Sequence, residues 1–280
     1  MCAGLALLAL AGCGGGSTAA THATHATHTT HATRSATAAQ APPPKDTALP
    51  QPSVRCGKPE QRAITLRFPA ADGASLDGAI VGTGRIGVVL LHEYPGPMCG
   101  WWPYATYLAH HGLTAMLFDF RCFGLSACPH GGRGEPVADV KGAIKALRAR
   151  GITSMALLGA SFGGAVAVVA GSRLHPAAVV DLSGERDLTG LLPGAKLNAV
   201  AAASALHAPA LFAVARDDRY VSVADTRAVY RRVGSATKRL TVLPASAGHG
   251  WDMLIGADFS WSPLAREVLA FIRDHAQATR

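Results

Sequence analysis

Hydrophobic and polar residues alternate along the chain from residue 64 onward with the periods of strands and helices. Two alternating runs at 64–68 and 76–81 flank Asp72-Gly73, a pair favoured in turns, and predict a hairpin at one edge of a sheet. Apolar runs then recur between longer segments that suit helices. The further predicted strands are 86–91, 114–118, 154–158, 177–182, 210–215 and 238–243. The predicted helices are 101–111, 137–150, 161–173, 223–233 and 260–276.

Strands that alternate with helices predict an α/β fold, with a mostly parallel central sheet and helices on both faces. We expect this domain to span 56–280. The connection 183–209 is short, so no cap domain is expected. Ligands of such sheets bind beyond the carboxyl ends of the strands, and candidate functional residues belong there.

The segment 155–164 combines an apolar run, the motif Gly159-Ala160-Ser161-Phe162-Gly163 and the start of a small-residue helix. A Gly-x-Ser-x-Gly motif between a strand and a helix is typical of a strained turn that lifts a serine hydroxyl above the sheet edge. The alternative is a glycine-rich turn that contains a serine by chance. We therefore treat Ser161 as a candidate nucleophile.

A serine nucleophile needs an adjacent base, which a third group orients. His249 lies in a small-residue loop after the last predicted strand, and we favour it as the base over His92. Asp218, in the turn after the strand 210–215, is the preferred orienting acid, with Asp217 as the alternative. The resulting chain order of serine, aspartate and histidine is that of the α/β-hydrolase type of triad.

Four motifs together resemble the α/β-hydrolase family, specifically its small lid-less members similar to dienelactone hydrolases and small esterases. These are Leu91-His92-Glu93-Tyr94-Pro95-Gly96, Asp119-Phe120-Arg121-Cys122-Phe123-Gly124-Leu125-Ser126, the turn at 159–163, and Asp218 with His249. The resemblance covers 62–276. It implies a serine hydrolase that cleaves carboxylic esters or related acyl bonds of a small-molecule substrate through an acyl-enzyme, without a metal or organic cofactor.

The resemblance also implies an oxyanion hole made by the backbone amides of Tyr94 and Phe162. The sequence departs from the family pattern at Glu93 and Cys122, two positions where glycine is common. Dienelactone hydrolases place a glutamate near the position of Glu93, but beside a cysteine nucleophile, whereas the candidate nucleophile here is a serine.

Glu93, Trp101 and Trp251 are candidates for the wall of the substrate pocket, together with Trp102, Leu191 and Leu192. Ordinary core packing is an equally good interpretation of the tryptophans. Two other functions remain open for the same residues: a peptidase or amidase with the same triad, and a binding module that retains the fold without turnover.

The N-terminal segment predicts export. Residues 1–12 contain a short apolar stretch, and Leu10-Ala11-Gly12-Cys13 resembles the lipobox of bacterial lipoproteins, which implies lipidation of Cys13 and an extracytoplasmic location at the cell membrane. Residues 13–55 are rich in Thr, Ala, His and Pro and are expected to form a disordered tether. Its histidines at 22, 25, 28 and 31 favour a solvated spacer over a metal-binding tract.

Charge and cysteine content narrow the partners and the compartment. The net charge is +8, but only 16% of residues are charged and no basic block occurs, so we expect no nucleic-acid partner. Membrane contact is expected through the lipid anchor alone. Besides Cys2 and Cys13 there are Cys56, Cys99, Cys122 and Cys128. In an oxidising compartment four cysteines predict two disulfides, and three pairings are possible. Cys122 and Cys128 share a loop and are the easiest pair to close.

Overall fold

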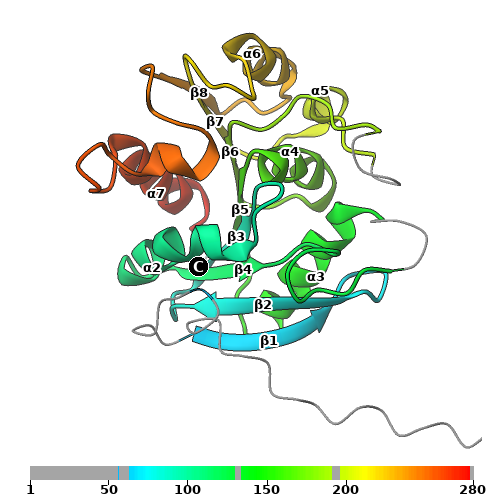
Figure 1. Ribbon diagram of the computed structural model, residues 1–280. Helices are drawn as coiled ribbons and strands as arrows, with labels where there is room; N and C mark the ends of the chain where they lie inside the picture. Colours follow the sequence, from blue (N-terminus) through cyan, green and yellow to red (C-terminus); the bar gives the residue numbers. More distant parts are fainter. Residues whose placement is uncertain (1–55, 57–62, 130–133, 191–195, 278–280) are drawn as a thin grey trace, which may run out of the picture. The chain divides into compact units, whose positions relative to one another are not determined.

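In the described part of the chain, eight strands form a single sheet in the order β1-β2-β4-β3-β5-β6-β7-β8. Figure 1 shows this order in the computed structural model. The strands are β1 (Ala63–Pro69), β2 (Ser75–Val81), β3 (Ile86–Leu91), β4 (Thr114–Phe118), β5 (Ser154–Ala160), β6 (Ala178–Leu182), β7 (Ala210–Ala215) and β8 (Lys238–Leu243). The β1–β2 and β2–β4 pairs are antiparallel and all other pairs are parallel. The predicted edge hairpin and mostly parallel sheet are therefore confirmed.

The structure describes residue 56 and residues 63–129, 134–190 and 196–277. The predicted signal at 1–12, the tether at 13–55 with its histidines, and the lipidation site Cys13 lie outside these residues, as do Leu191 and Leu192. No helix of the described residues has the length and apolar character needed to cross a membrane.

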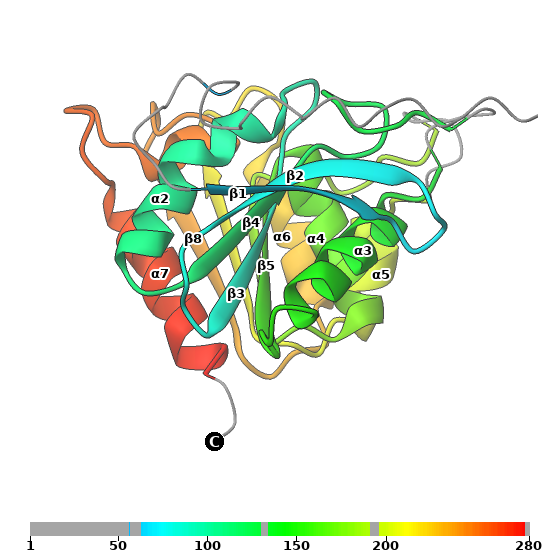
Figure 2. The ribbon, with the colours of Figure 1, turned by 90° about the horizontal axis from the view of Figure 1, so that it is seen from below.

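Helices cover both faces of the sheet, with α2 and α7 on one face and α3, α4, α5 and α6 on the other (Figure 2). Their bounds are α2 (Trp102–His110), α3 (Pro136–Arg148), α4 (Phe162–Leu174), α5 (Ala199–Ala202), α6 (Val223–Arg232) and α7 (Pro263–His275). Short 3-10 helices are η1 (Met98–Trp101), η2 (Ala203–Ala205) and η3 (Gly250–Leu254). Two hydrophobic cores result, one on each face of the sheet.

The central strands are apolar throughout because both of their faces are covered. In β3, Val89 and Leu91 belong to one core, whereas Val88 and Leu90 belong to the other. This alternation follows from the two-residue period of a strand, which points successive side chains to opposite faces. A continuous apolar run was therefore a sound signal for the buried strands of this sheet.

Local capping explains where the helix boundaries differ from the predicted ones. α7 begins at Pro263 and not at 260, because the Ser262 hydroxyl accepts the Ala265 N–H and the ring of Pro263 suits the first helical position. The short helix α5 was not predicted. In the described part of the β6–β7 connection it is joined by η2 and a bridge between Asp187 and Asn198, with no cap domain.

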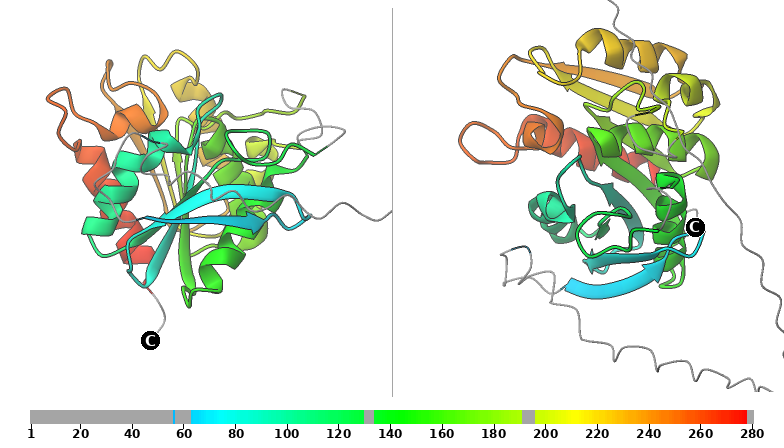
Figure 3. Two further views of the ribbon diagram at one scale, coloured as in Figure 1. Left: turned by 60° about the horizontal axis from the view of Figure 1, so that its bottom comes forward. Right: turned by 45° about the vertical axis from the view of Figure 1, so that its right-hand side comes forward.

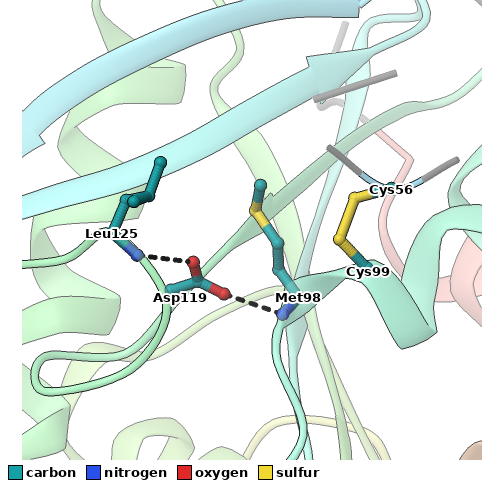
Figure 4. The surroundings of a disulfide bond; sticks show 5 residues. All are labelled: Cys56, Met98, Cys99, Asp119 and Leu125. Atoms are coloured by element: carbon teal, nitrogen blue, oxygen red, sulfur yellow. Dashed lines mark hydrogen bonds between the residues drawn. A yellow bond between two sulfur atoms is a disulfide. The ribbon is translucent and has the colours of Figure 1, made fainter. Parts of the chain in front are cut away.

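Two disulfides join Cys56 to Cys99 and Cys122 to Cys128, so the pairing within the shared loop is the one formed. The first bond attaches Cys56 to η1, which contains Cys99. Beside it, Asp119 Oδ1 accepts the Met98 N–H at 2.8 Å and Oδ2 accepts the Leu125 N–H at 3.3 Å (Figure 4). Both disulfides are compatible with an extracytoplasmic location.

A buried ion pair holds the loop after β4. Arg121 is 3% exposed and donates through Nε to Asp139 Oδ1 at 2.9 Å, and its terminal nitrogens also bind Asp72. Asp139 lies on α3 and Asp72 in the hairpin turn between β1 and β2. Arg121 thereby joins three segments that are far apart in the sequence.

Candidate active site

Ser161 occupies a sharp turn between the carboxyl end of β5 and the first residue of α4. Its φ of 52° and ψ of −121° lie in a region that residues with a side chain rarely adopt. The turn needs a glycine at 163, where an added Cβ would collide with the Leu91 carbonyl at the end of β3. The predicted strand–turn–helix context of the Gly-x-Ser-x-Gly motif is present.

The amide of Phe162 is the first of the helix α4, and N–H groups at this end have no partner within the helix. The same helix end carries the positive pole of the helix dipole. The Phe162 amide is therefore suited to hold a negative oxygen bound to a carbon attached to Ser161.

The hydroxyl of Ser161 forms a hydrogen bond with a carboxylate that was not predicted from the sequence. Ser161 Oγ donates to Glu185 Oε1 at 3.0 Å, and Ser161 itself is 5% exposed. Among the described residues, no hydrogen bond joins Ser161 to His249. Glu185 follows the carboxyl end of β6, which pairs with β5. Its position after a strand was therefore predictable from the sequence in the same way as that of Asp218.

His249 and Asp218 form the closest contact among the predicted site residues. His249 Nδ1 lies 2.9 Å from Asp218 Oδ1 and 2.8 Å from Oδ2. Asp218 also accepts the N–H groups of Tyr220 at 2.9 Å and Val221 at 3.0 Å, which fix its orientation. With Nδ1 occupied by the carboxylate, Nε2 is the ring nitrogen left for proton exchange.

Burial and hydrogen bonding act in opposite directions on this pair. Burial alone would raise the pKa of Asp218, but the hydrogen bond from His249 and those from the backbone outweigh it and lower that pKa. Burial alone would lower the pKa of His249, but the hydrogen bond and negative charge of Asp218 raise it, with Glu93 and Glu185 contributing. The imidazole is thus held as a stronger base than usual.

Asp217 has a different place from Asp218. Its two carboxylate oxygens accept the Ser246 N–H at 2.9 Å and 3.0 Å. Ser246 belongs to the segment between β8 and His249, so Asp217 braces that loop. The carboxylate that bonds to the imidazole is the preferred one, Asp218.

Glu93 connects the turn after β3 with the loop that carries His249. Glu93 Oε1 accepts the Trp251 N–H at 2.9 Å, and burial raises the pKa of Glu93 to about 7. Gly250 has a φ of +54°, and an added Cβ would overlap Glu93 Oε1 and lie 3.3 Å from the Cβ of Ala160. The backbone beside His249 therefore packs against the residues just before Tyr94 and Ser161.

The loops after the parallel strands gather at one end of the sheet (Figure 3). One of these loops begins with His92, directly after β3, and its side chain is fully buried. Its Nε2 accepts the Phe120 N–H at 3.0 Å, and its Nδ1 lies 2.7 Å from the Glu93 carbonyl. Both ring nitrogens of His92 are thus engaged by backbone groups in a neutral ring, which suits a structural role.

The aromatic candidates divide between core and surface. Trp101 is fully buried and meets Trp251 edge to face, with 5.6 Å between ring centroids, and Trp102 is 1% exposed. The burial of Trp101 and Trp102 among core residues agrees with the core-packing interpretation. Trp251 is partly exposed, and Tyr94 is 47% exposed with its ring 5.8 Å from that of Phe123. Within the described residues, no group of three or more His, Cys, Asp or Glu side chains is arranged to hold a metal ion.

Comparison with known proteins identifies the architecture. No family model and no curated protein matches this sequence. An esterase from Pyrococcus furiosus is similar in structure, with a TM-score of 0.66 and 18% identity over 80% of this chain and 94% of that chain. An α/β-hydrolase from a Penicillium species gives 0.64 at 17% identity over 78% and 100% of the two chains. A lid-less α/β serine hydrolase from Xanthomonas campestris gives 0.57 at 20% identity over 78% and 97%. The chain therefore has the α/β-hydrolase fold, and its described residues contain no cap domain.

Proposed function

We propose that this protein is a serine hydrolase that cleaves carboxylic esters or related acyl bonds. Ser161 is the nucleophile, His249 the general base and acid, and Asp218 the group that orients His249. The observation that carries the proposal is the 2.8 Å contact between Asp218 and His249 Nδ1, and the strained turn that holds Ser161 after β5 supports it. The ester-cleaving structural neighbours support the class of bond.

In the proposed reaction the Ser161 hydroxyl first turns from Glu185 toward His249. His249 Nε2 takes the hydroxyl proton while Oγ bonds to the carbonyl carbon, and the carbonyl oxygen becomes negative. The amides of Tyr94 and Phe162 hold that oxygen, and each donor fixed in this way contributes roughly 3 kcal/mol to lowering the barrier. His249 then gives the proton to the leaving alkoxide, which departs as an alcohol. In the second half, water attacks the acyl carbon while His249 takes a proton from it. The bond to Ser161 Oγ then breaks and His249 returns the proton to Oγ.

The proposed location is outside the cytoplasm, with lipid attached to Cys13. The two disulfides support an oxidising compartment. Incorporation of a labelled fatty acid into the expressed protein, lost in Cys13→Ser, is the expected result. Labelling that persists in Cys13→Ser would contradict the anchor.

The function is tested with Ser161→Ala against a matched control, Ser172→Ala. Ser172 lies on the same helix, α4, and its hydroxyl donates to the Val169 carbonyl. Ser172→Ala therefore removes the same hydroxyl group at a position outside the proposed site. Hydrolysis of an aryl acetate and labelling by a fluorophosphonate should be abolished in the Ser161 variant and kept in the control. Full turnover by a folded Ser161→Ala protein would exclude the proposal. A panel of matched esters and amides separates an esterase from an amidase.

A further inference from the structure

Glu185 forms a hydrogen bond with the candidate nucleophile Ser161, but it has no role in the triad mechanism. Its Oε1 accepts the Ser161 hydroxyl at 3.0 Å, and this bond must be released before His249 can take the proton. A carboxylate that only competed for the nucleophile would slow the reaction. When the hydroxyl turns away, Glu185 Oε1 loses its hydrogen-bond donor.

The second oxygen of Glu185 is buried, and no other residue in the described part of the chain donates a hydrogen bond to it. A buried carboxylate oxygen without a donor is costly. The next residue, Arg186, is directed to Asp225 at 3.2 Å and does not neutralise Glu185. No arginine or lysine of the described residues forms an ion pair with Glu185. Once the Ser161 hydroxyl turns away, Oε1 also lacks a donor from another described residue, and a donor supplied by a ligand at Oε1 would compensate the carboxylate.

The charges around Glu185 favour a cation. Asp218 and Glu93 add negative charge to the region of Glu185, and His249, which can carry positive charge there, is neutral when it acts as the base. Burial raises the pKa of Glu185, and a cation bound beside it would favour the ionised form. An anionic substituent of a substrate would meet repulsion at this place.

Position relative to the reacting atoms decides which part of a substrate would meet Glu185. The carbonyl carbon must come within about 3–3.5 Å of Ser161 Oγ before attack. A substituent on the adjacent carbon of the acyl group then lies close to Oγ as well. Because Glu185 Oε1 is already in hydrogen-bond contact with Oγ, such a substituent is within reach of the same carboxylate.

We propose that Glu185 is a specificity-determining residue that binds a protonated amine on the α-carbon of the acyl group, so that the preferred substrates are esters of α-amino acids. The inference rests on the proposed function and deepens it. In the free protein Glu185 bonds to Ser161. In the substrate complex the ammonium takes this place and leaves the hydroxyl to His249.

The test compares three methyl esters that differ in one substituent of the α-carbon: methyl alaninate, methyl isobutyrate and monomethyl methylmalonate. Their α-carbons carry a methyl group together with an ammonium, a second methyl or a carboxylate. An ammonium also activates an ester chemically, so the informative quantity is the ratio of kcat/KM for alaninate and isobutyrate, compared between the wild-type protein and Glu185→Gln. We expect this ratio to fall roughly tenfold to hundredfold in Glu185→Gln, the loss of a hydrogen bond between charged groups. The methylmalonate ester should be the poorest substrate of the wild type and gain in the variant.

Two further variants make the result decisive. Glu267→Gln, a change of the same kind in an exposed ion pair with Arg239, should leave the ratio unchanged. Glu185→Asp retains the charge and should retain part of the preference for the amine, which also covers the case in which Glu185→Gln does not fold. A wild-type ratio that persists in Glu185→Gln or disappears in Glu185→Asp overturns the amine assignment.

Hydrolysis of an aryl acetate by the wild type and by Ser161→Ala tests the proposed function independently of the role of Glu185. If the wild-type protein hydrolyses an aryl acetate and Ser161→Ala does not, the hydrolase proposal stands whatever Glu185 does. If Ser161→Ala keeps full hydrolysis of all esters, the hydrolase proposal and the inference that rests on it both fail.

Discussion

Glu93 and Gly250 are in direct contact across the site, so closely that Gly250 has no room for a Cβ beside Glu93 Oε1. The two residues are far apart in the sequence. Glu93 precedes Tyr94, whose backbone amide is a proposed donor of the oxyanion hole, and Gly250 follows His249, the proposed base. This contact thus sets the distance between two parts of the proposed machinery.

Replacing Gly250 by alanine should impair activity through this contact. The added Cβ would collide with Glu93, and the positive φ at this position is unfavourable for alanine, so His249 should be displaced. We expect kcat/KM for an aryl ester to fall by at least about tenfold, since a displacement of 1 Å can cost a hundredfold. Gly73→Ala is the matched control, because Gly73 also has a positive φ but no atom within 4 Å of an added Cβ. Equal activity losses in both variants would show that strain alone, and not the contact, is responsible.

The two adjacent aspartates should differ in their importance for turnover. In Asp218→Asn the imidazole loses the carboxylate on Nδ1 and is held in the wrong tautomer, so kcat should fall by about 10⁴. Asp217→Asn retains an oxygen acceptor for the Ser246 N–H, and a loss of only a few-fold is expected. Steady-state kinetics of the two variants side by side provide the measurement. A larger loss at 217 would make Asp217 the catalytic acid.

The rate should fall on the acid side at a higher pH than the ordinary titration of histidine. His249 acts as a base only when neutral, and its pKa is raised above 6.5 because of Asp218, Glu93 and Glu185. Activity is therefore present above this pKa and lost as the pH falls through it. Glu93, with a pKa of about 7, is partly ionised in this range, so its replacement in Glu93→Gln should move the midpoint of kcat/KM against pH to lower pH. A midpoint that stays in place would show that Glu93 does not act on His249 electrostatically.

Arg121 should matter for stability because it neutralises a buried carboxylate. The side chain of Asp139 is fully buried and bonded to Arg121, so Arg121→Met would leave an unpaired charge in the interior. We expect a loss of roughly 3–5 kcal/mol in the free energy of unfolding, measured by urea denaturation. Arg186→Met removes an exposed ion pair with Asp225 and should cost less than about 1 kcal/mol. Similar losses in the two variants would contradict the structural role of Arg121.

Several features of this protein could be read from the sequence because they depend on neighbours along the chain. Apolar runs with the right period marked the strands, including β4, β7 and β8 with their observed bounds. The glycines around Ser161 marked the turn after β5. Asp218 and His249 were identifiable because each follows the carboxyl end of a strand, and such ends meet at one edge of a parallel sheet.

Only the tertiary structure decided which side chains at that edge touch. It placed Asp218 on the imidazole and Asp217 on the Ser246 amide, although the two are adjacent in the sequence. It brought Glu185 to the Ser161 hydroxyl and buried Trp101 completely. Hydrophobic periodicity shows which face of an element is buried, but a contact across the sheet depends on strand order and on the direction of each side chain. Those are properties of the packed molecule, and no local pattern contains them.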